Sequence, residues 1–174
     1  KLNKPYSHGN FHLSYGMVDL PTGKMKSREG TVVDADDLMD EMVQTAKERT
    51  IELGKTDGFT EDASNELYQQ LGMGALKYYL LKVDPKKRMM FNPAESIDFQ
   101  GNTGPFIQYT HARICSITRK AKELGIDLMD THANSSELTV TEIDLIYILG
   151  QYKSIIESAA EAFSPSLIAM YAYD

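Results

Sequence analysis

The stretch Gly101-Asn102-Thr103-Gly104-Pro105-Phe106-Ile107-Gln108-Tyr109-Thr110-His111-Ala112-Arg113-Ile114 leads from a glycine-rich turn into a strongly periodic run of residues. The positions that follow the period of an amphipathic helix are Ile107, Thr110, Ile114, Ile117, Ala121 and Leu124. Gly125 follows the last of them and is a typical residue for a helix end. We therefore predict one helix from Pro105 to Leu124.

Helical periodicity recurs in most of the remaining chain. It predicts helices over residues 34–53, 60–81 and 140–163, and the Pro-containing segment 92–98 suits one short helix. Residues 11–18 instead alternate loosely, which is typical of a strand at the edge of a larger sheet. The predicted fold class is mainly α, a helical bundle preceded by a short β segment, with a loop at 126–139.

Two glycines lie inside the second predicted helix, at Gly72 and Gly74. A glycine within a helix costs roughly 1 kcal/mol relative to alanine unless a neighbour uses the space. We therefore predict that another element packs closely there.

The composition indicates an ordinary soluble protein of one or two domains. The chain has 174 residues, of which 42% are hydrophobic and 25% are charged, and its net charge is -7. No apolar run is long enough to span a membrane, and no leader sequence is visible, so we expect a cytoplasmic protein. Both ends read as cuts, so we expect a piece of a larger enzyme.

The thiol and imidazole side chains predict neither a disulfide nor a metal site. Cys115 is the single cysteine, and we expect it to be a small core residue. The histidines, His8, His12, His111 and His132, have no partner at ligand spacing, so we predict no structural metal.

A basic loop follows the strand-like segment, with the sequence Gly23-Lys24-Met25-Lys26-Ser27-Arg28-Glu29-Gly30. It places three cations within five residues in a chain that is acidic overall. Glycines allow a close approach of the backbone to a ligand, and ammonium and guanidinium groups donate to phosphate oxygens. The pattern favours a phosphate-binding loop, although short charged turns between glycines are also common.

Two motifs in order resemble one known family. The segment His12 to Val18 leading into the basic loop resembles the signature-loop region of class I arginyl-tRNA synthetases. The stretch from Gly101 to Ile114 is similar to the entry into that family's helical anticodon-binding domain. The resemblance implies the C-terminal end of a Rossmann-like catalytic domain with connecting helices at 1–104. It also implies the truncated start of a DALR-type helical domain at 105–174.

The resemblance further implies the substrates and the ATP-binding residues. It implies an ATP-dependent ligase that uses ATP with Mg²⁺, L-arginine and tRNA(Arg), acts as a monomer and does not contact a membrane. The matched loop gives Lys24, Met25, Lys26, Ser27 and Arg28 as ATP-phosphate contacts, with Lys24, Lys26 and Arg28 as the catalytic cations. Compared with the family's Lys-Met-Ser-Lys-Ser pattern, only the first two positions match as they stand. An ion pair between Arg28 and Glu29 is the alternative for that arginine.

The predicted helix at 105–124 is the best candidate for an RNA-binding surface. Gln108, Tyr109, His111 and Arg113 offer stacking planes and hydrogen-bond donors for single-stranded anticodon bases. A solvated basic face with Tyr109 in the core is the alternative. The basic connector at 82–88 is either a second RNA contact or a solvated turn.

Three functions remain open from the sequence. The first is part of an arginyl-tRNA synthetase, the second is another class I synthetase, and the third is a non-enzymatic helical RNA-binding module. The His-x-Gly-His type signature of the class I nucleotide site is absent, because His8-Gly9-Asn10 lies too close to the basic loop to fill that role. We therefore expect the isolated chain to be inactive.

Overall fold

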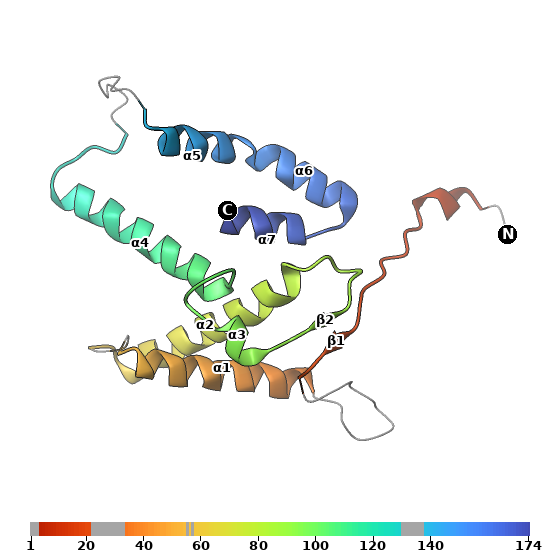
Figure 1. Cartoon of the computed structure of the whole chain (residues 1–174), viewed down its shortest axis with the longest axis horizontal. Helices are drawn as coiled ribbons and strands as arrows, with labels where there is room; N and C mark the ends of the chain where they lie inside the picture. The colour runs from red at the N-terminus through yellow and green to blue at the C-terminus, as the bar shows by residue number, and fades with distance from the viewer. Residues whose placement is uncertain (1–3, 22–33, 55, 57, 130–137) are drawn as a thin grey trace.

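The computed structural model describes residues 4–21, 34–54, 56, 58–129 and 138–174 (Figure 1). The elements in order are η1 (Pro5–Gly9), β1 (Val18–Asp19), α1 (Ala35–Glu52), α2 (Glu61–Leu81), β2 (Met89–Met90), α3 (Pro93–Ser96), α4 (Gly104–Glu123), α5 (Val140–Gly150), α6 (Tyr152–Ala162) and α7 (Ser166–Tyr173). The described chain is mainly helical, as predicted. Among the described residues, none of the helices has the length and apolarity that crossing a membrane requires.

Polar side chains cap the predicted helices where they begin. Asp34 accepts from the Asp36 N–H at the start of α1, Thr60 caps α2 and Thr103 caps α4. The glycines after α1 and α4, at positions 54 and 125, have φ values of +60° and +72°. Such left-handed positions end a helix without strain when the residue is glycine. The sequence placed α1, α2, α3 and α4 correctly.

The core lies where α1 and α2 pack against β2 and α3. Met42 and Ala46 of α1, Ala75 of α2 and Phe91 after β2 are at most 1% exposed. The ring of Phe91 meets that of Tyr79 edge-on, with centroids 5.1 Å apart. The segment from β2 to the end of α3 is therefore part of the core.

Two glycines of α2 mark its closest contacts, as predicted. A Cβ at Gly72 would lie 2.9 Å from the carbonyl group of Met42, and one at Gly74 would lie 2.5 Å from Gln108 Nε2. Gly104 at the start of α4 lies against the Gly74 carbonyl. Because these glycines have no side chain, α1 packs closely on one side of α2 and α4 packs closely on another.

The predicted strand at 11–18 is much shorter in the structure. Only Val18–Asp19 form β1, which pairs in parallel with β2, Val18 opposite Met89 and Asp19 opposite Met90. The backbone of Gly16 also donates to the Pro85 carbonyl at 2.6 Å. Among the described residues, the alternating positions before Gly16 form no ladder of backbone hydrogen bonds with another strand, so they do not extend β1.

The predicted single helix at 140–163 is wrong, because the chain forms α5 and α6 with a break at Gln151. The Gln151 N–H bonds to the Ile148 carbonyl in a tighter i to i−3 turn. Tyr171 of α7 donates to that same carbonyl at 2.9 Å, which satisfies it from outside the helix. Gly150 lowers the cost of leaving the α-helical pattern. In Figure 1, α7 lies between the α5–α6 pair and α2.

Candidate nucleic-acid interface

The predicted phosphate contacts lie outside the residues that the structure describes, and they are Lys24, Met25, Lys26, Ser27 and Arg28. The described chain reaches Pro21 on one side of them and resumes at Asp34 on the other. The roles assigned to these five side chains therefore stay predictions.

A bidentate ion pair holds the strand that precedes this loop. Arg88 Nη2 donates to Asp19 Oδ1 at 2.8 Å, and Arg88 Nε donates to Asp19 Oδ2. This hydrogen bond raises the pKa of Arg88 above its usual range. The Phe91 N–H also donates to the Asp19 carbonyl at 2.7 Å. Sequence reasoning missed the pair, because its members are 69 residues apart and no local pattern links them.

The lysines of the basic connector differ in their surroundings. Lys82 Nζ donates to the Asn102 carbonyl at 2.8 Å and lies 4.5 Å from the centroid of the Tyr79 ring. Burial lowers the pKa of this ammonium group. Lys86 and Lys87 are exposed. Any contact of the connector with RNA backbone would therefore fall to Lys86 and Lys87.

The four predicted RNA contacts divide between two sides of α4. Gln108 packs against α2, where its Nε2 donates to the Gln70 carbonyl at 2.9 Å. Its Oε1 is buried, with no hydrogen-bond partner in the described part of the chain. Tyr109, His111 and Arg113 are exposed. One residue of the motif thus anchors the helix, and three are presented outward.

The exposed side of α4 combines a phenol, an imidazole and a guanidinium group. Tyr109 is 45% exposed, so it is not in the core of this chain, and Arg113 Cζ lies 5.9 Å from the centroid of its ring. His111 Nε2 is 3.6 Å from Cys115 Sγ one turn later. The prediction that Cys115 is a core residue is wrong, since its side chain is exposed.

A cavity of about 1100 Å³ lies beside this part of α4. Its apolar wall comes from several elements and includes Leu53, Leu67, Leu71, Phe99 and Phe106. Gln108, Tyr109 and His111 line its α4 side. Largely apolar walls with a few polar groups are typical of sites that bind small molecules or bases. Three of the four predicted RNA contacts therefore border one cavity.

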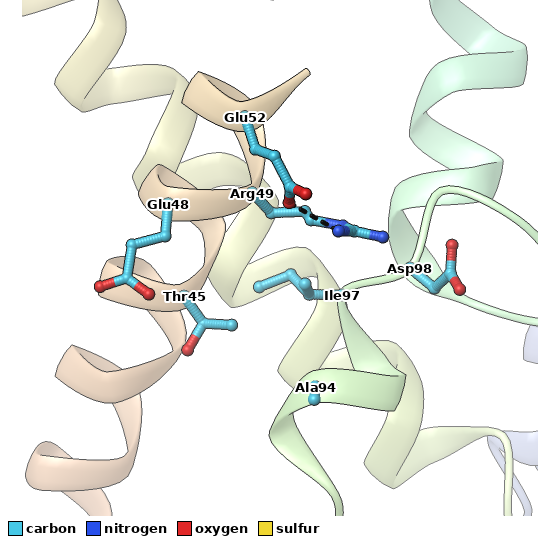
Figure 2. A pocket seen from close by; sticks show the side chains of 7 residues that line it. All are labelled: Thr45, Glu48, Arg49, Glu52, Ala94, Ile97 and Asp98. Carbon is cyan, nitrogen blue, oxygen red and sulfur yellow. Dashed lines mark hydrogen bonds and ion pairs between the residues drawn. The ribbon is translucent and has the colours of Figure 1, made fainter.

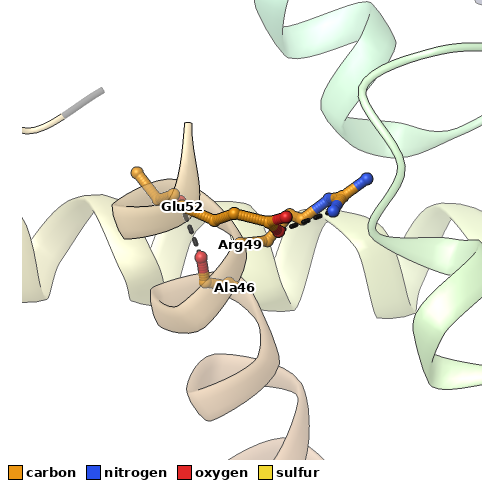
Figure 3. A network of polar contacts seen from close by, with 4 residues as sticks. Ala46, Arg49 and Glu52 are labelled. Carbon is orange, nitrogen blue, oxygen red and sulfur yellow. Dashed lines mark hydrogen bonds and ion pairs between the residues drawn. The ribbon is translucent and has the colours of Figure 1, made fainter. Parts of the chain in front are cut away.

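A smaller cavity of about 340 Å³ lies between α1 and α3 (Figure 2). It is lined by Thr45, Glu48, Arg49, Glu52, Ala94, Ile97 and Asp98. Arg49 Nη1 donates to Glu52 Oε2 at 2.6 Å, and in the same turn the Ala46 carbonyl accepts from Thr50 Oγ1 at 2.6 Å (Figure 3). Exposed ion pairs of this kind add little stability. No predicted site residue lies in this cavity.

No group of His, Cys, Asp or Glu side chains suited to a metal ion occurs within the described ranges.

Two family models match the chain in the order expected from its motifs. The model of the class I (R) tRNA synthetase catalytic domain matches residues 2–92, more than half of the chain. The model of the DALR anticodon binding domain matches residues 107–174. The chain belongs to the arginyl-tRNA synthetase family. The resemblance inferred from the two motifs is confirmed.

Relatives in the arginyl-tRNA synthetase family extend well beyond this chain. The arginine--tRNA ligase of Phocaeicola vulgatus is 56% identical over 174 residues, which is all of this chain and 29% of the relative. The chain therefore spans less than a third of the length of the curated relatives that it matches.

Solved structures of the family share the fold. The Thermus thermophilus arginyl-tRNA synthetase matches with a TM-score of 0.76 and 30% identity, over 92% of this chain and 25% of that one. The Plasmodium falciparum enzyme matches with a TM-score of 0.69 at 24% identity, over 92% of this chain and 26% of that one, and supports the fold alone.

Proposed function

We propose that the full-length protein is an arginine-tRNA ligase that activates arginine with ATP and transfers it to tRNA(Arg). The observation that carries this proposal is the 56% identity, over the whole chain, to a relative named for that activity. In the first step the arginine carboxylate attacks the α-phosphorus of ATP and pyrophosphate leaves. In the second step a terminal ribose hydroxyl of the tRNA attacks the carbonyl carbon of the arginyl adenylate formed in the first, and AMP leaves. Mg²⁺ would accompany the nucleotide.

The basic loop would serve the first step. Negative charge builds on the β- and γ-phosphate oxygens as pyrophosphate leaves, and cations that bind it more tightly in the transition state lower the barrier. We assign direct phosphate contact to Lys24 and Lys26 and a hydroxyl or backbone contact to Ser27. Arg28 would make a bidentate contact or anchor the closed loop. Met25 is the remaining position of the loop that we assign to ATP binding.

The exposed side of α4 would bind the anticodon region of the tRNA. Tyr109 and His111 offer planes on which unpaired bases can stack, and the guanidinium of Arg113 suits phosphates and base edges. Their exposure, and the cavity that two of them border, support this role. Gln108 would contribute by holding α4 on α2 through its bond to the Gln70 carbonyl.

The two proposed roles divide the chain into two domains. We propose that residues 1–104 end the catalytic domain and that residues 105–174 begin the anticodon-binding domain. The limits of the two family matches, residue 92 and residue 107, support a boundary in this region. We propose further that the protein acts in the cytoplasm as a monomer and that the isolated chain is inactive.

The test is ATP–pyrophosphate exchange by the full-length protein in the presence of tRNA(Arg). Exchange that depends on arginine supports the proposal. Exchange that depends on a different amino acid would indicate another class I synthetase. Exchange with none of them would indicate a helical RNA-binding module without ligase activity.

A further inference from the structure

Three segments that are distant in the sequence meet at Asn102. Tyr78 Oη of α2 lies 2.5 Å from Asn102 Oδ1 and 3.2 Å from the Ala169 carbonyl of α7. Asn102 Nδ2 in turn points to Met170 Sδ of α7 at 3.6 Å. The turn before α4 therefore links α2 to α7.

Lys82 strengthens the same junction one turn further along α2. Its Nζ donates to the Asn102 backbone carbonyl at 2.8 Å. Asn102 is thus held through its side chain by Tyr78 and through its backbone by Lys82. Burial, with smaller contributions from Tyr173 and Asp174, raises the pKa of Tyr78 to about 12.

The helix held at this junction contacts the rest of the C-terminal half. Tyr171 of α7 donates to the Ile148 carbonyl near the end of α5. The Tyr173 ring lies 5.7 Å from that of Phe106 in α4. Figure 1 shows α7 between α2 and the α5–α6 pair. The contacts of α7 with α2, together with the packing of α4 on α2 at Gly74 and Gln70, therefore determine where the helices of the DALR match lie relative to the catalytic-domain match.

We propose that Tyr78 and Asn102 are positioning residues that set the orientation of helices α4 to α7 relative to the catalytic-domain segment, and so determine how productively tRNA binds. The inference rests on the proposed function, because one tRNA must contact α4 with its anticodon while its 3′ end reaches the site of chemistry. If the junction is loosened, only part of the population has the competent orientation. The apparent affinity for tRNA then falls to that fraction of its intrinsic value.

The experiment compares two neighbouring tyrosines of α2 in the full-length protein. Tyr78→Phe removes the hydroxyl at the junction, and Asn102→Ala removes its partner. Tyr79→Phe is the matched control, since the Tyr79 hydroxyl also donates to one backbone carbonyl, but that of Met90 in β2, at 3.1 Å, and not that of Ala169 in α7. We expect KM for tRNA(Arg) to rise by up to about fivefold in the first two variants, the largest effect that one lost hydrogen bond can have on the competent fraction. We expect kcat and KM for ATP to stay within about twofold in all three.

Equal KM values for tRNA in Tyr78→Phe and Tyr79→Phe would overturn the proposal, even if both variants lowered the melting temperature. A second measurement reads the orientation directly, as the spin-label distance between positions 47 on α1 and 153 on α6. The distribution should broaden in Tyr78→Phe and not in Tyr79→Phe, and equal distributions would also overturn the proposal. If the wild-type protein does not transfer arginine, the proposed function fails, and the distance measurement alone decides whether the junction sets the orientation.

Discussion

Helices α2 and α5 are both rich in apolar residues, but they differ in what they bury. α2 buries Tyr68, Leu71, Ala75 and Leu76. α5 buries no residue, and Ile143, Ile146 and Leu149 are each more than half exposed. Apolar residues at helical spacing therefore specify a helix but do not by themselves specify a core. The difference indicates that the stability of this chain is concentrated in α1, α2, α3 and β2.

The largest expected effect removes the ring at the centre of that core. Phe91→Ala should lower the free energy of unfolding by about 3–5 kcal/mol, because Phe91 is fully buried against Tyr79. Ile146→Ala on α5 is the control and should change it by no more than about 0.5 kcal/mol, because that side chain is 56% exposed. Urea unfolding of the 174-residue chain, followed by circular dichroism, measures both. Equal losses of unfolding free energy in the two variants would show that stability is not concentrated around Phe91.

A smaller effect is expected from adding one methyl group to each region. Gly72→Ala should destabilise the chain by about 1–3 kcal/mol, because the new Cβ would lie 2.9 Å from the Met42 backbone. Gly150→Ala should be neutral or stabilising by up to about 1 kcal/mol, since nothing lies within 4 Å of a Cβ there. Thermal unfolding of the two variants tests the prediction. A higher melting temperature for Gly72→Ala would show that α1 and α2 are not in close contact.

The smallest effect concerns the start of α5, where stability depends on a local hydrogen bond more than on packing. The Thr139 N–H and Oγ1 donate to Glu142 Oε2 at 2.7 and 2.8 Å, and these bonds hold the pKa of Glu142 below its usual value of 4.5. A depressed carboxyl pKa contributes stability that is complete above 4.5 and is lost as the pH falls through the lower, folded-state value.

An NMR titration of the Glu142 carboxyl carbon measures this pKa directly. It should fall below 4.5 in the wild-type chain and move upward in Thr139→Ala, which loses the side-chain bond but keeps the backbone donor. A normal pKa in the wild-type chain would show that the cap at α5 does not form.

The elements that depend on local signals were predictable from the sequence. Asp34 and Thr60 at helix starts, Gly54 and Gly125 past helix ends, and the regular spacing between them place α1, α2 and α4. The glycine pair of α2 also predicted close packing, which the contacts with Met42 and Gln108 confirm.

The features that depend on distant contacts were not predictable. The break at Gln151 depends on Tyr171, a residue of another helix, and β2 has only two residues, too few for a periodic pattern. For the candidate site, the motif at 101–114 predicted the position of α4 correctly. It did not predict that Gln108 faces α2, because that contact depends on residues of another helix. The residues of the basic loop lie outside the described chain, so their predicted roles stay predictions.

Aminoacylation of tRNA(Arg) by the full-length protein tests most directly whether the exposed side of α4 carries the RNA. Tyr109→Ala and Arg113→Ala should each raise KM for tRNA by roughly tenfold, because one stacked base or one guanidinium contact contributes about 1–3 kcal/mol. Lys153→Ala, which removes an exposed cation from α6, is the control and should leave KM within about twofold. Unchanged KM values in both α4 variants, with arginine still transferred, would contradict the assignment of this surface.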